Sequence, residues 1–270
     1  MADVTEHVFG LHPCLPLKTD QETSYATGDD GDLELGISKS FTITDVATTI
    51  NITINSKTHA LSDDVVQDNR TGLMWARYVP NADIGPATNG MLFWEEWELA
   101  DKTDISFDNA TGEIRSAASE FNTSALCAGR KLTVTGTDSN DGTYTVSSIT
   151  TGAITTVEGV ADEAAGDTVT ITTVDDLIWD ALDQANANSL GGYTDWRIPN
   201  WFEVGSILDL EECGPTIDTT VFPSTPSNYH WCASTRPCDS SYAFGVHLGH
   251  GYMYISNKQR SKYYVRFVRG

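Results

Sequence analysis

The sequence predicts an α+β fold, in which a host domain of mixed helices and strands carries a small all-β module as an insertion. Helical patterns occur at about residues 93–102, after residue 174 and from residue 200, among short strands. Between about residues 103 and 173 the chain is instead rich in Thr, Ser, Gly and Val, in alternating runs separated by turn signals. The expected domains are residues 1–66, a loop and strand segment that is part of the host domain or packed on it; residues 67–102 with 174–270, a discontinuous host domain; and residues 103–173, the inserted module.

The amino-acid composition is strongly acidic. The 270 residues include 16 Lys and Arg against 38 Asp and Glu, a formal net charge of −22. Such a surface repels phosphate backbones and anionic lipids, so we expect no nucleic-acid partner. Apolar runs are too short for a membrane span, and MADVTEHVFGLHP lacks a basic region followed by an apolar core, so we expect neither membrane insertion nor a signal peptide. If the protein acts outside the producing cell, we therefore expect it to leave by a route that this sequence does not encode.

Five cysteines occur at scattered positions, and none forms a C-x-x-C pair. A structural zinc site is therefore not expected. Cys213, Cys232 and Cys238 lie close enough in sequence for one disulfide, and free buried thiols are the open alternative.

The first hundred residues predict loops, short strands and one helix. TGDDGDLELG, residues 27–36, is typical of a turn-rich loop, and residues 41–60 indicate one or two strands with Ile50, Ile52 and Ile54 in alternation. DNRTGLMWAR, residues 68–77, reads as a turn followed by a short buried strand. FWEEWELADK, residues 93–102, predicts a helix.

Two further helices are predicted after the Thr-rich stretch. The first has Asp175 or Asp176 as its N-cap and a Gly191-Gly192 stop. Its apolar stripe comprises Ile178, Ala181, Leu182 and Ala185. The second opens on an Asn-x-x-Glu capping pattern, and its inner face comprises Val204, Ile207 and Leu208.

An unusual run, AFGVHLGHGYMYISNKQ, occupies residues 243–259. Phe244, Val246 and Leu248 alternate with Gly, His and Gly, so a strand here has one apolar face and one face of Gly and His. A second short run places Tyr and Ser around Met253. Such residues suit neither a core nor an ordinary charged surface, which indicates a specialised face.

Four motifs together resemble a known family: TGLMWAR, GGYTDWRIPNWFEV, YHWCAST and the terminal YVRFVRG. The sequence is similar to the domain found at the C-terminus of bacterial collagen-like adhesins and in many phage proteins, which has a C-type-lectin-like fold. The match departs from the family's Tyr-Trp-Ser-Ser-Thr turn at Cys232 and Ala233. The resemblance implies that strands near residues 73–75 and 264–268 pair. It also implies structural roles for Asp195, Trp196, Arg197, Arg266 and Arg269. Residues 103–173 resemble a β module common in phage structural proteins.

Members of this family include targets of diversity-generating retroelements, which substitute bases at adenines of Asn-type codons. The resemblance implies a variable ligand-binding surface, with residues reachable from such codons at Gly245, His247, Gly249, His250, Tyr252, Tyr254, Ile255, Ser256 and Asn257. The intervening apolar residues and Gly251 would be the fixed scaffold. The same surface is expected to extend to His230, Cys232, Arg236, Asp239 and Tyr242.

Tyr, His, Ser, Gly and Asn are the residues of antibody-like binding surfaces, because they combine rigid rings with adaptable hydrogen bonding. The leading hypothesis is a receptor-binding protein at a viral tail tip, located in the virion or at an extracellular surface, that recognises a protein or glycan on a host cell. The main contacts would be His247, His250, Tyr252 and Tyr254. Other virion proteins and further copies of the chain are additional candidate partners. A cell-surface adhesin, or a virion assembly protein with a fixed surface, are the alternatives.

No enzyme is predicted, and no cofactor. The sequence has no Ser-His-Asp order, no phosphate-cradling loop, and no Glu-Pro-Asn or Gln-Pro-Asp motif of calcium-dependent lectins. Cys232 and Cys238 lack the surrounding pattern of the formylglycine-generating oxidases, which have a related fold. His247 and His250 could meet a metal with Asp239, but two histidines in a Gly-flanked turn more often face solvent.

Overall fold

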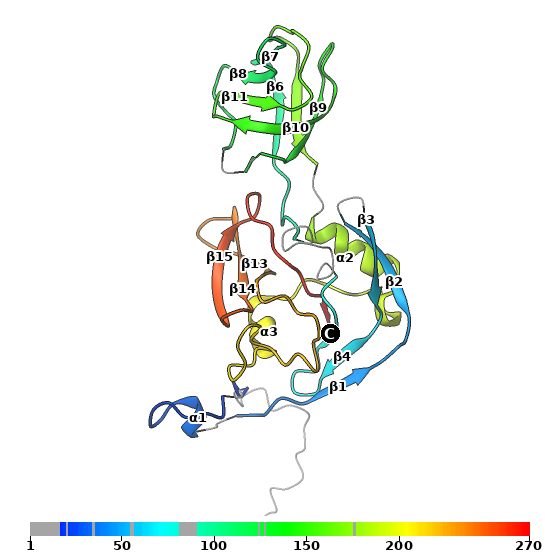
Figure 1. Ribbon diagram of the computed structural model, residues 1–270, viewed down its shortest axis with the longest axis vertical. Helices are drawn as coiled ribbons and strands as arrows, with labels where there is room; N and C mark the ends of the chain where they lie inside the picture. Colours follow the sequence, from blue (N-terminus) through cyan, green and yellow to red (C-terminus); the bar gives the residue numbers. More distant parts are fainter. Residues whose placement is uncertain are drawn as a thin grey trace, which may run out of the picture. The chain divides into compact units, whose positions relative to one another are not determined.

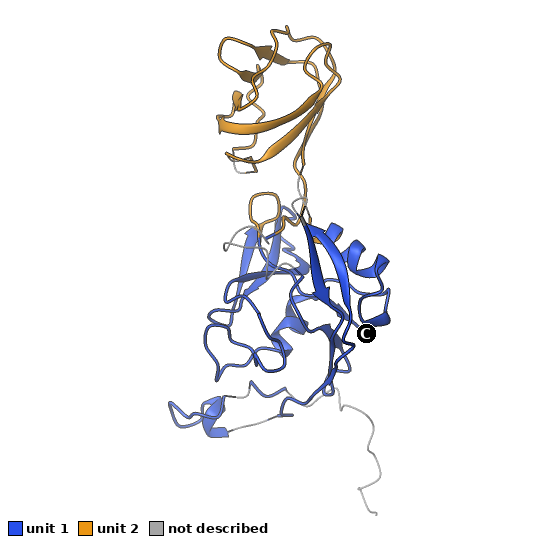
Figure 2. Ribbon diagram, turned by 45° about the vertical axis from the view of Figure 1, so that its right-hand side comes forward, with its two compact units in different colours: residues 1–91, 180–256, 263–270 blue, residues 92–179, 257–262 orange. Residues whose placement is uncertain are grey.

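The computed structural model describes residues 17–19, 21–33, 36–54, 57–80, 91–123, 125–126, 128–174 and 177–270. The chain forms two compact units (Figures 1 and 2). Unit 1 comprises residues 1–91, 180–256 and 263–270, and unit 2 comprises residues 92–179 and 257–262. The domain boundaries drawn from the sequence stay a prediction.

The prediction of an α+β fold with a C-type-lectin-like host domain is wrong. In the described part of the chain, sixteen strands form four sheets, and the three α-helices have only 4, 10 and 6 residues. The protein is therefore mostly β. The physical reason is that strand pairing takes up part of the segment 93–102, whose local pattern favoured a helix, and that the two predicted helices that do form are short.

A four-stranded antiparallel sheet of unit 1 has the order β1-β4-β5-β16. Its strands are β1 (Phe41–Thr44), β4 (Val65–Asp68), β5 (Met74–Ala76) and β16 (Val268–Arg269). Val268 lies opposite Trp75, and Arg269 lies opposite Met74. The expected pairing of the segment near residue 74 with the C-terminal segment is thus confirmed.

Two more strands of unit 1, β2 (Thr49–Ile54) and β3 (Lys57–Ser62), form a hairpin of their own. Ile50, Ile52 and Ile54 are 7%, 0% and 1% exposed, so the predicted alternation is confirmed. The predicted loop over residues 27–36 contains a four-residue helix, α1 (Asp30–Leu33).

Two predicted helices are present. The first, α2 (Ile178–Ala187), buries the four-residue stripe expected of it and is followed by a short 3-10 turn, η1 (Leu190–Gly192). Its predicted N-cap, Asp175 or Asp176, lies outside the described residues. The second, α3 (Trp201–Ser206), opens on a complete capping box between Asn200 and Glu203.

A three-stranded sheet, β13-β14-β15, completes unit 1. The strands are β13 (Tyr229–Thr235), β14 (Tyr242–His247) and β15 (Tyr252–Asn257). Between this sheet, α3 and the four-stranded sheet lies one hydrophobic core. Its members include Val66, Trp75, Val204, Ile207, Ile217, Phe222, Cys232, Val246, Leu248 and Val268.

Unit 2 contains a seven-stranded antiparallel sheet of order β6-β12-β9-β10-β11-β8-β7. The strands are β6 (Glu98–Lys102), β7 (Ile105–Asp108), β8 (Glu113–Ser116), β9 (Lys131–Thr135), β10 (Gly142–Ile149), β11 (Ala153–Thr156) and β12 (Val169–Thr173). Six of these strands, β7 to β12, lie between residues 103 and 173, which confirms the expectation of alternating strands there. The helix expected over residues 93–102 is wrong, because Leu99 turns into the unit 2 core and its strand pairs with β12.

Two ion pairs hold the Asp195-Trp196-Arg197 segment within unit 1. Asp195 accepts hydrogen bonds from Arg269 at 2.7 and 3.1 Å, and Arg197 donates to both carboxylate oxygens of Glu203 at 2.7 Å. The buried Trp196 donates its indole N–H to the Leu190 carbonyl. The three residues thus have structural contacts. Asp195 and Arg197 do not pair with each other: Asp195 pairs with Arg269, and Arg197 pairs with Glu203.

Candidate ligand-binding site

The two faces of the β13-β14-β15 sheet have different surroundings, because side chains alternate between the faces along each strand. His230 lies opposite Val246, and this face joins the core. Tyr229 lies opposite His247, and Trp231 lies opposite Gly245, on the other face. The sheet therefore buries one row of side chains and presents the next row outward.

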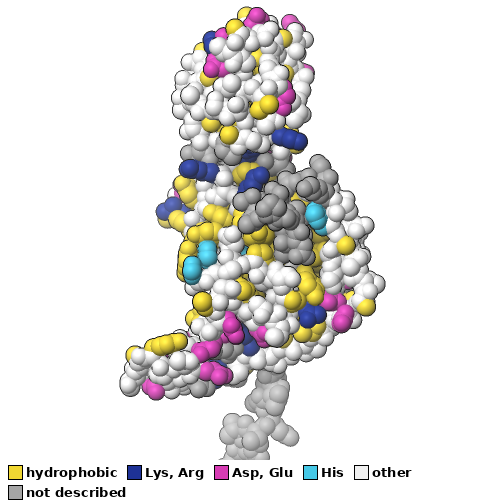
Figure 3. Space-filling view, viewed as in Figure 1, with side chains coloured by type: hydrophobic (Ala, Val, Ile, Leu, Met, Phe, Trp, Pro, Cys, Tyr) yellow, Lys and Arg dark blue, Asp and Glu magenta, His cyan; other side chains and the backbone are white. Residues whose placement is uncertain are grey.

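The outward row forms a cluster of rings, which we call the aromatic face: Tyr229, His247, His250, Tyr252, Tyr254 and Tyr263. The His247 ring stacks on His250 at 4.8 Å and on Tyr252 at 5.2 Å. Tyr229 contacts His247 edge-on at 4.3 Å, and its hydroxyl lies 3.1 Å from that of Tyr252. Figure 3 shows histidine side chains beside hydrophobic ones in the region of β14 and β15. Each ring is held by its neighbours, so the face is ordered before any partner arrives.

Beneath the aromatic face lies a rigid support. Trp231 is fully buried and packs against Tyr263 at 4.7 Å. Gly245 beside it has no side chain, which leaves room for the Tyr254 ring, and the Tyr254 hydroxyl donates to the His230 carbonyl at 3.4 Å. The Tyr254 ring can approach β14 this closely only because residue 245 is glycine.

Burial and hydrogen bonding shift the pKa values of three rings of the aromatic face, His247, Tyr229 and Tyr254, toward the neutral forms. Burial, and then the neighbouring His250, lower the pKa of His247, so its neutral form is favoured. Its Nδ1 accepts a hydrogen bond from the Gly249 N–H at 3.1 Å, which fixes the ring. The hydrogen bond to Tyr252 raises the pKa of Tyr229, and burial raises that of Tyr254.

Most residues of the predicted variable stretch lie on or directly under this face. His250 and Tyr252 are exposed, His247 and Tyr254 are partly buried, and the Ser256 hydroxyl lies 2.9 Å from that of Tyr263. Gly245 and Gly249 are buried under the rings.

Ile255 and Asn257 fall on the alternate phase of β15, away from Tyr254. Ile255 is 42% exposed there. The Asn257 side chain instead accepts hydrogen bonds from the Gln259 and Arg260 backbone N–H groups, at 3.0 Å each. Asn257 therefore closes a turn.

His230 and Cys232, to which the surface was expected to extend, are 2% and 0% exposed on the core face of β13, so they do not lie on the aromatic face. A role for them in ligand binding stays a prediction. Arg236, Asp239 and Tyr242 belong to the β13–β14 turn: the Arg236 N–H donates to the Tyr242 carbonyl, and the Tyr242 N–H donates to the Asp239 carbonyl. This turn lies at the opposite end of the hairpin from His247. These three residues are therefore not brought together with the aromatic face.

Tyr229 and Tyr263 are members of the face that the sequence did not suggest. In YHWCAST the two alternating sets are Tyr, Trp, Ala and His, Cys, Ser, and either could be the outward one. Trp231 belongs to the outward set and is nevertheless fully buried, because the Tyr263 ring covers it. A segment that follows the sheet in sequence thus decides the phase of β13.

The segment of the chain that contains this sheet has few acidic residues. Residues 219–270 contain one acidic residue, Asp239, and six basic ones, although the whole chain has 38 Asp and Glu. Interface centres are depleted of charged residues because burying a carboxylate is costly. The aromatic face can therefore be covered by a partner without that cost.

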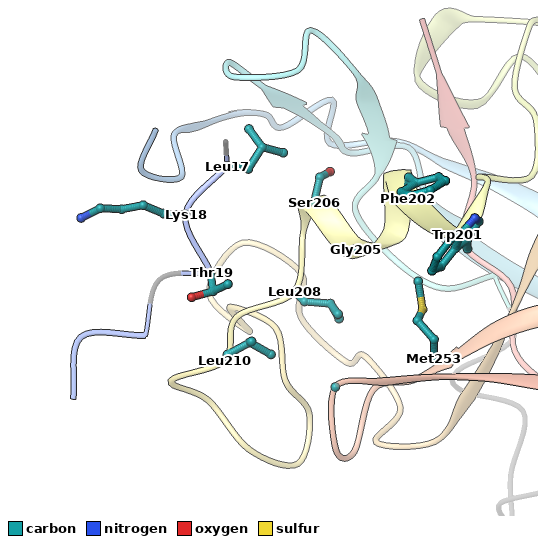
Figure 4. A pocket seen from close by; sticks show the side chains of 11 residues that line it. Leu17, Lys18, Thr19, Trp201, Phe202, Gly205, Ser206, Leu208, Leu210 and Met253 are labelled. Atoms are coloured by element: carbon teal, nitrogen blue, oxygen red, sulfur yellow. The ribbon is translucent and has the colours of Figure 1, made fainter. Parts of the chain in front are cut away.

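Apart from the aromatic face, unit 1 has a pocket of about 300 Å³ between α3 and the segment around Leu17 (Figure 4). Trp201, Leu208, Leu210 and Met253 line it with Leu17, while Lys18 points away. Phe202 at its rim is 72% exposed. Its lining offers apolar contact and no pair of titratable groups for acid–base chemistry.

The described residues supply no metal-binding group of three or more His, Cys, Asp or Glu side chains. Within the described residues, Cys213, Cys232 and Cys238 form no disulfide. Burial raises the pKa of the Cys232 thiol, which keeps it protonated and poorly nucleophilic. Cys14 and Cys127 lie outside the described residues. Among the described helices, none has the length and apolar content to span a membrane.

Fold and site together define a β-rich protein whose three-stranded sheet, β13-β14-β15, displays a cluster of Tyr and His rings. The chain belongs to the family of the Lcl C-terminal domain, whose model matches residues 64–269. This match confirms the family part of the expected resemblance. No curated protein matches the chain, and no solved structure does.

Proposed function

We propose that this protein is a receptor-binding protein that recognises a protein or glycan on a host cell through the aromatic face. The observation that carries the proposal is the cluster of six Tyr and His rings, mutually packed on a sheet that is itself anchored in the core. Aromatic residues of this kind give a large contact area at a low cost in conformational entropy. Membership of the Lcl C-terminal domain family is consistent with this role.

We further propose that the face is diversified by a retroelement and acts at a viral tail tip. The support is positional: exposed His250 and Tyr252 can change without altering the core, because the rigid floor beneath them is made by other residues. The protein then acts by binding and not by catalysis, with no cofactor and no nucleic-acid partner.

Binding is tested with the full chain and intact candidate host cells. We expect the double variant His250→Ala/Tyr252→Ala to bind at least about tenfold more weakly, because central aromatic contacts are typical hot spots. Tyr25→Ala is the matched control, since Tyr25 is 79% exposed and lies outside the aromatic face. Equal binding by all three proteins would remove the aromatic face as the site.

Diversification is tested by sequencing the 3′ end of the gene in many members of one population, and by searching beside it for a near-identical non-coding repeat. We expect differences at His247, His250, Tyr252 and Ser256, with Gly245 constant. An invariant stretch with no repeat would favour the cell-surface adhesin, or the virion assembly protein with a fixed surface.

A further inference from the structure

Among the buried polar atoms of unit 1 that have no hydrogen-bond partner within the described residues, three belong to residues around one cavity: Trp75 Nε1, His230 Nε2 and Arg266 Nε. Their residues are 0%, 2% and 3% exposed, so bulk water does not satisfy them. An unpartnered buried polar group is destabilising, because it loses its hydrogen bonds to water, and three around one cavity are unusual. All three residues line the same small cavity, of about 10 Å³, whose other walls are Pro199, Val204, Ile207, Trp231 and Leu248.

The remaining contacts of these side chains fix which atoms donate. His230 Nδ1 lies 3.0 Å from the Asn228 carbonyl oxygen, which can only accept, so Nδ1 carries the hydrogen and Nε2 is an acceptor. Burial lowers the pKa of His230 to about 3, in agreement with a neutral ring. The indole N–H of Trp75 and the Nε–H of Arg266 are donors. The other nitrogens of Arg266 are already occupied: Nη1 donates to the Ala76 and Arg77 carbonyls, and Nη2 donates to the Thr225 hydroxyl.

An occupant of this cavity must therefore accept two hydrogen bonds and donate one, within the volume of a single small molecule. A halide ion accepts but cannot donate, and an ammonium ion donates but cannot accept. A water molecule does both, needs about 10–15 Å³, and typically makes about three hydrogen bonds when buried.

We propose that one buried water molecule occupies this cavity and joins Trp75, His230 and Arg266. It links β5, β13 and the segment that leads into β16, which are far apart in sequence. Trp231 lines the cavity and also supports Tyr263, so the water lies directly below the floor of the aromatic face. This site is independent of any ligand on the aromatic face.

The test is a water–protein NOE and ROE experiment on the ¹⁵N-labelled full chain. We expect the Trp75 indole proton to give a water cross-peak with the sign of a long-lived bound molecule. The Trp196 indole proton is the internal control: it is also buried, but it donates to the Leu190 carbonyl, so it should give none. The variant Trp75→Phe assigns the peak by removing it.

A crystal structure provides the second measurement. It should contain one water with three nitrogen neighbours at about 2.7–3.2 Å. The proposal is overturned if the Trp75 and Trp196 indole protons behave alike, if the cavity is empty, or if His230 Nε2 bonds directly to one of the two donors. The variant His230→Leu, which removes the acceptor, should abolish the Trp75 cross-peak. Persistence of that peak would likewise contradict the proposed coordination.

Discussion

Replacing Arg266 with Met is expected to lower the free energy of unfolding by about 3 kcal/mol. The side chain is 3% exposed and donates to the Ala76 and Arg77 carbonyls at 2.8 Å and to the Thr225 hydroxyl at 2.6 Å. Removing the guanidinium takes the donor from the two carbonyls, while the Thr225 hydroxyl keeps its hydrogen bond to the Phe222 carbonyl. A buried acceptor left unsatisfied costs about 1–3 kcal/mol. Relief of the burial of an unpaired charge offsets part of the sum. Urea denaturation of the full chain, followed by near-UV circular dichroism, measures the change.

Arg269→Met is the matched control, since Arg269 stands three residues later in the same terminal segment. Its partner Asp195 has a side chain that is 60% exposed, and such surface pairs contribute about 1 kcal/mol or less. Similar losses for both variants would contradict the assigned role of Arg266. Arg266→Lys adds a second check: a point charge cannot reproduce the fork of hydrogen bonds, so a large loss is expected even with the charge retained.

The substitution Gly245→Ala is expected to destabilise the protein by about 2–3 kcal/mol, as overpacking in a core does. An added Cβ would lie 2.6 Å from the His230 carbonyl oxygen and would also clash with the Tyr254 hydroxyl. Because one obstacle is backbone, rotation of a side chain alone cannot relieve the contact. Thermal unfolding of the full chain measures the effect as a lowered Tm.

Gly205→Ala provides the comparison. This glycine lies in α3, where an added Cβ meets nothing within 4 Å, so alanine should be neutral or should stabilise the helix. A wild-type Tm for Gly245→Ala would show that the sheet can shift under the rings. Gly245 would then be as free to vary as its neighbours.

Much of the local structure could be predicted from the sequence, because it depends on near neighbours. The capping box at Asn200, the buried stripe of α2, the alternation in β2 and the six strands of residues 103–173 all follow from short patterns. The helix predicted over residues 93–102 failed, because pairing of β6 with β12, far along the chain, outweighs local propensity. The fold class failed for the same reason: strand pairing is non-local.

The candidate site was predicted in part. On β14 and β15 the alternation is unambiguous, since one face is plainly apolar, and His247, Tyr252 and Tyr254 lie together as expected. On β13 both faces carry a large aromatic or apolar residue, so the sequence does not decide which one turns outward. The outward orientation of Trp231 is compatible with its burial because Tyr263 covers it, and this contact exists only in the folded chain.

The position of β15 at the edge of its sheet has a consequence for the evolution of the surface. An edge strand offers unpaired backbone groups to other chains, and the residues of β15 carry no charge and no proline. Exposed Arg260 and Lys262 follow shortly afterwards and oppose stacking of one copy on another by charge repulsion. Under the proposed recognition role, replacements on this strand would be selected against self-association as well as for binding, which would favour amphipathic rings over purely apolar side chains.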